Sequence, residues 1–223
     1  MSRTIDVPAR VAMHARRRAA LGWLVAAAAT GLGGCGGSLL PKPQPAPALY
    51  GLDDGAPPAS PPPAPPGAPS LMVALPRAAA GLDTRLIAYQ RQPQRTEFYA
   101  QSEWLDTPPR LLAPLLLRAI EATGAFAVVL PAPAAAATRW RLDTELLRLQ
   151  QQFGAGPSQV RLTLRAVLVD SASRAVLATR EFDLLQRAPS EDAAGGVVAA
   201  QRAALQVAQA LAVFCAEAAR RGG

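Results

Sequence analysis

A stretch dominated by proline divides this chain into parts that fold by different rules. Twelve prolines occur between Pro41 and Pro69, and alanine, glycine and serine fill much of the rest of these 29 residues. Proline fixes φ and has no backbone N–H, so such a segment cannot form a long stretch of helix or sheet. We expect a semi-rigid tether here, rising by about 3.1 Å per residue where it adopts polyproline II geometry.

One apolar island interrupts the proline-rich stretch. Ala48-Leu49-Tyr50-Gly51-Leu52-Asp53 contains two leucines and a tyrosine within six residues. Large apolar and aromatic side chains need a surface on which to be buried. We therefore expect a short strand near residues 48–53 that docks on the domain that follows the tether.

The segment before the tether has the layout of a secretory signal peptide. Arg16, Arg17 and Arg18 precede an apolar run over 19–29, and small residues then lead to Cys35. A membrane-spanning helix needs about 20 mostly apolar residues, and residues 19–34 are fewer and interrupted by glycine. The quartet Leu32-Gly33-Gly34-Cys35 resembles the lipobox of bacterial lipoproteins. That resemblance implies that residues 1–34 are removed as a lipoprotein signal peptide and that Cys35 becomes the acylated first residue.

The charge of the chain gives little reason to expect a nucleic-acid partner. The formal net charge is +7, but five arginines and one aspartate lie within residues 1–34, which leaves 18 basic and 15 acidic side chains in the remainder, a net charge of +3. Most of these basic residues occur singly and form no stripe of the kind that tracks a phosphate backbone. We therefore expect no binding of nucleic acid.

Histidine and cysteine usage restricts the chemistry further. The only histidine, His14, lies in the expected signal peptide, which excludes histidine-based catalysis and imidazole metal ligation in the mature chain. If Cys35 is acylated, Cys215 has no partner for a disulfide within the chain. Cys215 falls on the apolar stripe of an expected helix, where a free cysteine usually behaves as a small hydrophobe, and pairing between molecules is the alternative.

Two pairs of carboxylates are the nearest approach to a catalytic motif. Asp143 with Glu145, and Glu181 with Asp183, each have the i, i+2 spacing that puts both members on one face of a strand. Such a pair can perform general acid–base catalysis. More often it belongs to the solvated face of a half-buried strand, with arginines as cross-strand neighbours. The candidate neighbours are Arg141, Arg161, Arg165 and Arg180.

We therefore expect a protein that is not an enzyme, with no catalytic residues, no cofactor and no metal site. Phosphate-binding loops, nucleophile elbows and Cys-x-x-Cys pairs are all missing from the sequence. Trp104 and Trp140 are interpreted as core or edge aromatics rather than as a ligand cage.

Residues 70–223 are long enough for one self-sufficient core. Alternation of apolar and polar residues is cleanest over 159–170, and an apolar helical stripe runs from Leu111 to Thr123, with Asp106 or Thr107 as cap and Gly124 as the end. A second helix is expected over about 191–221. The expected strands are 71–75, 85–91, 95–102, 125–130, 139–151, 159–170 and 175–186. This pattern predicts an α+β fold, a mostly antiparallel sheet with two main helices packed on one face.

The order of motifs resembles the ABC-type transport auxiliary lipoprotein family. After the lipobox come Tyr50-Gly51-Leu52-Asp53, Val73-Ala74-Leu75-Pro76, Leu82-Asp83-Thr84-Arg85-Leu86-Ile87-Ala88-Tyr89 and Glu103-Trp104-Leu105, then the leucine helix, the antiparallel strands and the alanine-rich final helix. The sequence departs from the family pattern at Ala78-Ala79-Ala80-Gly81, where the family favours a proline and a tyrosine.

The resemblance implies a lipoprotein anchored in the outer membrane, on its periplasmic face, by acyl chains on Cys35. It implies docking on an MCE-domain protein and an ABC permease that move lipid across the envelope, and it is compatible with a homo-oligomer. Gly36 and Gly37 follow the cysteine, so the aspartate that marks retention in the inner membrane of enteric bacteria is absent. Two alternatives stay open: a structural lipoprotein that assists outer-membrane assembly or secretion, and direct binding of lipid, which needs an apolar cavity.

Overall fold

The structure, a computed structural model, describes residues 45–52 and 60–222 of the chain. The expected signal peptide, the expected acylation site Cys35 and residues 41–44 and 53–59 of the expected tether lie outside the described residues.

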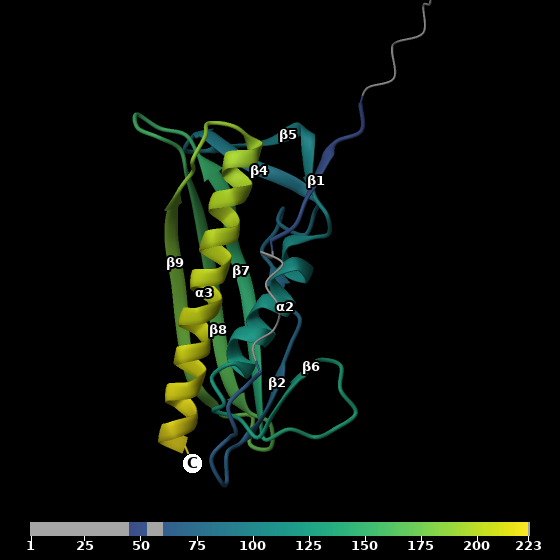
Figure 1. The fold of residues 1–223 in the computed structure, drawn as a ribbon, viewed down its shortest axis with the longest axis vertical. Helices are drawn as coiled ribbons and strands as arrows, with labels where there is room; N and C mark the ends of the chain where they lie inside the picture. Colours follow the sequence, from purple (N-terminus) through teal and green to yellow (C-terminus); the bar gives the residue numbers. More distant parts are fainter. Residues whose placement is uncertain (1–44, 53–59, 223) are drawn as a thin grey trace, which may run out of the picture. The chain divides into compact units, whose positions relative to one another are not determined.

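Three long antiparallel strands form the main body of the sheet (Figure 1). They are β7 (Trp140–Gln152), β8 (Gln159–Asp170) and β9 (Val176–Arg187), and the pairing of β8 with each neighbour runs nearly its full length. The apolar face predicted for β8 is confirmed, because Val160, Leu162, Leu164, Ala166 and Leu168 are all buried.

The second edge of β7 is shared by three shorter strands in succession. β2 (Ser70–Val73), β3 (Arg77–Ala78) and β4 (Leu86–Gln92) all run parallel to β7 and pair with its start, its middle and its end. The chain from residue 70 to residue 92 thus follows β7 along its length. The sequence predicts β2 and β4 but misses β3, and it does not reveal that these strands pair with β7.

The remaining strands extend the sheet beyond β4 and β2. β4 and β5 (Arg95–Trp104) form the predicted hairpin, β1 (Ala48–Tyr50) pairs in parallel with β5, and β6 (Val128–Pro131) pairs in parallel with β2. The described residues thus form a mixed sheet of nine strands whose long pairings are antiparallel. With its two helices, this sheet confirms the predicted α+β fold.

Helices α2 (Pro108–Glu121) and α3 (Ala193–Gly222) pack against each other in front of the sheet (Figure 1). Thr107 is the N-cap residue of α2, although its side chain makes no capping bond, and proline occupies the first turn, where its missing N–H costs nothing. Gly124, with a φ of 61°, follows the helix. Its backbone lies so close to Pro62 that an added Cβ would come within 2.6 Å of the proline ring.

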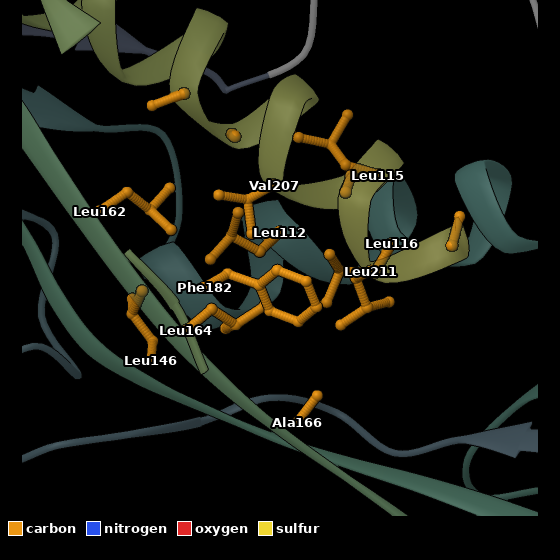
Figure 2. Close-up of a cluster of buried hydrophobic side chains, with 14 of the residues drawn as sticks. Leu112, Leu115, Leu116, Leu146, Leu162, Leu164, Ala166, Phe182, Val207 and Leu211 are labelled. Atoms are coloured by element: carbon orange, nitrogen blue, oxygen red, sulfur yellow. The ribbon is translucent and has the colours of Figure 1, made fainter. Parts of the chain in front are cut away.

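The core lies between these two helices and the sheet. Figure 2 shows Leu112 and Leu116 of α2, Val207 and Leu211 of α3 and Phe182 of β9 gathered over Leu146, Leu162 and Leu164. The inner stripe of α3 is rich in alanine, which lets the helix lie close to the strands. By length and composition α3 would also suffice to span a membrane, but here more than half of its most apolar stretch is buried within the protein.

Strand β1 attaches the first described residues to the domain. The Leu105 N–H donates to the Tyr50 carbonyl over 2.7 Å, and the Gln201 side chain donates to the Gly51 carbonyl over 3.2 Å. Leu52, only 1% exposed, then enters the core. Residues 48–52 of the apolar island therefore lie on the domain, and residues 48–50 form part of its sheet.

Candidate functional site

The carboxylates singled out from the sequence lie on the face of the sheet that points away from the helices. Glu145 of β7, Arg165 of β8 and Glu181 of β9 stand directly opposite one another. Arg165 Nη1 lies 3.6 Å from Glu145 Oε2, and its Nη2 lies 3.2 Å from Glu181 Oε2. One guanidinium thus bridges two carboxylates, one from each expected pair.

The other two carboxylates of these pairs are also matched with arginines. Arg141 Nη2 lies 2.8 Å from Asp143 Oδ1. Arg161 binds Asp183 in a bidentate manner, with Nε 2.9 Å from Oδ1 and Nη2 2.6 Å from Oδ2, and the Thr163 hydroxyl donates to the same carboxylate over 2.7 Å. These bonds lower the pKa of Asp183 to about 2. A carboxyl with that pKa holds no proton near neutral pH, so it cannot serve as a general acid.

This arrangement supports the interpretation of the two pairs as a solvated face balanced by arginine. Arg180, expected among the partners, differs: its guanidinium lies 5.4 Å from the centre of the Phe182 ring. Over residues 45–52 and 60–222 there is no group of three or more histidine, cysteine, aspartate or glutamate side chains placed to hold a metal ion.

The remaining candidates from the sequence belong to the core. Cys215 is fully buried, and this burial raises the pKa of its thiol to about 12, so the group stays protonated and unreactive in the folded protein. Trp104 and Trp140 are also buried, as expected of core aromatics. Cys35, the expected site of acylation, is outside the described residues and remains a prediction.

A polar cleft that the sequence did not reveal opens over the end of β7 and neighbouring residues of β4, β5 and β8. It has a volume of about 590 Å³, and we call it the arginine–glutamine cleft. Its lining consists of Gln90, Arg91, Gln92, Pro93, Thr96, Arg148, Gln150, Gln152, Phe153 and Arg161.

Three glutamines of the cleft are joined by hydrogen bonds. The side-chain amides of Gln150 and Gln152 both donate to Gln90 Oε1, over 2.9 and 3.3 Å, and the amide of Gln90 donates to the Pro93 carbonyl. The one available signal in the sequence is a Gln-x-Gln pattern, which occurs at the end of β4 (Gln90, Gln92) and again at the end of β7 (Gln150, Gln152). Nothing in the sequence shows that these two strand ends are neighbours.

Two apolar features also lie on the surface of the domain. An open groove of about 290 Å³ lies between α2 and the ends of β2 and β6, lined by Val73, Ala74, Leu75, Ala113, Pro114, Leu117, Pro131 and Ala132. Separately, Leu49 of β1 and Leu86 of β4 flank Glu103 of β5 in the sheet register, and both leucines are exposed. Leu105, 59% exposed, follows β5. We call Leu49, Leu86 and Leu105 the β1-side leucines.

Comparison with solved structures shows the same fold in other proteins. The crystal structure of a Xanthomonas campestris protein matches with a TM-score of 0.65 and 22% identity, covering 78% of this chain and 97% of that one. The crystal structure of an uncharacterized protein matches with a TM-score of 0.59 and 13% identity, covering 77% and 99%. No curated protein sequence matches this chain significantly.

The family is shown by the sequence itself. Residues 50–212 match the ABC-type transport auxiliary lipoprotein component family, a span that begins within β1 and ends within α3. The match covers most of the chain and agrees with the order of motifs noted above. The chain therefore belongs to the ABC-type transport auxiliary lipoprotein component family.

Proposed function

We propose that this protein is a non-catalytic lipoprotein of the outer membrane that serves an MCE-domain protein and an ABC permease in carrying lipid across the periplasm. The observation that carries the proposal is the family match over residues 50–212. The balanced ion pairs of Asp143, Glu145, Glu181 and Asp183 support the non-catalytic part, because each of these carboxylates already has an arginine partner.

In this proposal the chain works through anchoring and docking. Residues 1–34 are the signal peptide, Cys35 carries the acyl chains on the periplasmic face of the membrane, residues 35–69 form the linker, and residues 70–223 form the domain that meets the partners. Stable attachment requires more than one acyl chain, because a single chain holds a protein only marginally. The lipoprotein modification of Cys35 would supply them.

The β1-side leucines are the surface that we assign to docking. Exposed apolar side chains grouped on one face are typical of sites of protein contact. Here Leu49 and Leu86 flank β5, the strand that pairs with β1 of the linker. A partner bound there would therefore lie near the point where the linker joins the domain.

Site-specific photo-crosslinking in living cells tests the function. A photo-reactive amino acid in place of Leu105 should crosslink to an MCE-domain protein or an ABC permease. The same amino acid in place of Val213, which is 52% exposed on α3, serves as the matched control and should not. Recovery of barrel-assembly or secretion components from the Leu105 position would replace this proposal with the alternative of a structural lipoprotein.

The anchor has its own test. Cys35→Ala should abolish labelling by palmitate and release the protein from the outer-membrane fraction. Cys215→Ala should still be labelled and should stay in that fraction. Palmitate labelling that persists in Cys35→Ala would show that the lipobox interpretation is wrong.

A further inference from the structure

We propose that the arginine–glutamine cleft binds a phosphate-bearing group, of the kind that a phospholipid headgroup presents. The phosphate chemistry is argued from the cleft alone. The identification of its source as a phospholipid rests on the proposed function.

Arg148 provides the first argument for an anion in the cleft. It lies on β7 opposite Thr163, in the row of the sheet that continues to Asp183 on β9. Arg141, Asp143 and Glu145 on β7 and Arg161 and Arg165 on β8 all have an ion-pair partner. Arg148 is only partly exposed, yet its side chain has neither an ion pair nor a hydrogen bond among the described residues. The carboxylate on which Arg148 acts electrostatically is Asp183, which Arg161 already binds in a bidentate manner. Two guanidinium groups therefore share one carboxylate, and an anion in the cleft would balance the remaining positive charge.

Arg161 is a second arginine of the cleft, and its guanidinium is held in a fixed orientation. Its Nε and Nη2 are engaged by the two oxygens of Asp183, which leaves the N–H groups of Nη1 for a ligand. Because the bidentate pair fixes the plane of the guanidinium, a ligand would bind it with little loss of side-chain entropy. Asp183 therefore positions this arginine and does not itself line the cleft.

Arg91 adds a third positive charge at the rim. Its guanidinium lies 5.2 Å from the centre of the Tyr89 ring and 5.6 Å from that of Phe153. It has no carboxylate partner among the residues described. The stacking positions the guanidinium without neutralising its charge.

The glutamines supply further donors. Gln90 Oε1 accepts from both Gln150 and Gln152, so the orientation of these two amides is fixed. Each of the two amides keeps a second N–H for a ligand oxygen. Phosphate has several oxygens that accept from donors in different directions, and planar guanidinium groups are well suited to bind them.

A second cleft of similar size gives the contrast. It measures about 570 Å³ and is lined in part by Arg141, Asp143, Asp170 and Arg174. Its lining contains two arginines and two carboxylates, so it has no surplus of positive charge. Three guanidinium groups and no carboxylate line the arginine–glutamine cleft, which is what favours an anion in it.

Calorimetric titration of the full-length protein, purified in a neutral detergent, tests the proposal. The probes are inorganic phosphate and glycerophosphoglycerol, the water-soluble headgroup of phosphatidylglycerol, with glycerol as the uncharged control. We expect saturable binding of both phosphate compounds and none of glycerol. Arg148→Gln should weaken this binding about tenfold, the usual scale for losing one charge-assisted donor. Arg174→Gln, from the second cleft, should leave it unchanged.

The two phosphate compounds and the two arginine variants distinguish the possible results. Tighter binding of glycerophosphoglycerol than of phosphate supports the phospholipid source, and binding of phosphate alone supports the anion site while overturning that source. Absence of saturable binding, or equal affinities in Arg148→Gln and Arg174→Gln, overturns the proposal. Should Arg148→Gln fail to fold, Arg91→Gln at the rim takes its place. A negative result in the calorimetric titration would not affect the crosslinking result, because crosslinking identifies the partner protein and does not depend on the cleft.

Discussion

At the scale of single residues, Gly196 determines how close α3 can approach the sheet. Its backbone lies against the side chain of Gln151, which is buried. Gln151 Oε1 accepts from the Tyr99 hydroxyl over 2.8 Å, and its amide donates to the Ser158 hydroxyl over 2.8 Å. Burial raises the pKa of Tyr99 to about 12, so this hydroxyl remains a donor throughout the neutral range. A satisfied polar network thus lies beneath the first turn of α3.

We therefore expect Gly196→Ala to lower the free energy of unfolding by about 1–3 kcal/mol, the usual cost of overpacking. The new Cβ would overlap Gln151 Oε1 and force either the helix or the amide to move. Urea denaturation measures the effect. Gly154→Ala is the matched control, since a Cβ there meets nothing within 4 Å, and it should change stability by no more than about 0.5 kcal/mol. Equal stability of the two variants would contradict the close packing described here.

Asp183 gives a prediction on pH. Its folded pKa of about 2 lies below the value of about 3.9 for an unfolded chain, so the ionised carboxylate stabilises the fold above about pH 4 and loses this contribution as the pH falls through 2. Asp183→Asn should accordingly have a lower urea midpoint than the wild type at pH 7, and the two midpoints should converge near pH 2. Asp83→Asn is the control, because Asp83 is exposed and has no ion pair among the described residues. A difference that persists undiminished at pH 2 would contradict this account.

At the scale of elements, β1 is short but joins the linker to the domain by three kinds of contact. It pairs with β5, the carbonyls of Tyr50 and of the following Gly51 accept bonds from Leu105 and Gln201, and Leu52 beyond it is buried in the core. A strand of three residues would contribute little without that apolar side chain.

Leu52→Ala should therefore destabilise the protein by about 2–5 kcal/mol, the range for emptying a buried leucine site. It should also expose the segment around β1 to proteolysis, because the strand loses its attachment. Thermal unfolding and limited subtilisin digestion measure the two effects. Leu49→Ala, at a position that is 51% exposed, should behave like the wild type. A Leu52→Ala protein as stable as Leu49→Ala would mean that β1 is not held by this side chain.

The long elements were predictable because each carries its own periodicity. The expected strand over 159–170 matches β8 at both ends, and the expected hairpin matches β4 and β5. β3 was missed because it has only two residues and lies next to Pro76, so no alternation can mark it. The parallel pairing of β2 and β4 with β7 joins residues about 60 to 70 positions apart, and no local pattern records it.

The same distinction explains the candidate sites. The ion pairs of Glu145, Arg165 and Glu181 were anticipated because neighbouring strands of a meander bring their faces together in a regular way. The arginine–glutamine cleft was not, because Gln90 and Gln150 meet only through the parallel contact between β4 and β7. Arg148 becomes informative only once its neighbours are known.

At the scale of the whole molecule, Cys215 reports whether the core is intact. It is fully buried on α3, and the raised pKa of its thiol makes it a poor nucleophile. In a Cys35→Ala chain, where it is the single thiol, maleimide should react only when the domain unfolds, so the labelling rate should follow the urea transition measured by fluorescence. Prompt labelling under native conditions would show that α3 separates from the sheet on its own.

The way β1 joins the sheet also bears on how the domain would carry a mechanical load. If the membrane anchor pulls on the linker, tension enters the domain at β1 before it reaches the rest of the fold. β1 runs parallel to β5, so a pull along the strand shears its hydrogen bonds together instead of opening them one by one. The core beyond Leu52 would feel no force until that short contact had yielded. The domain would then keep its shape while the anchor moves.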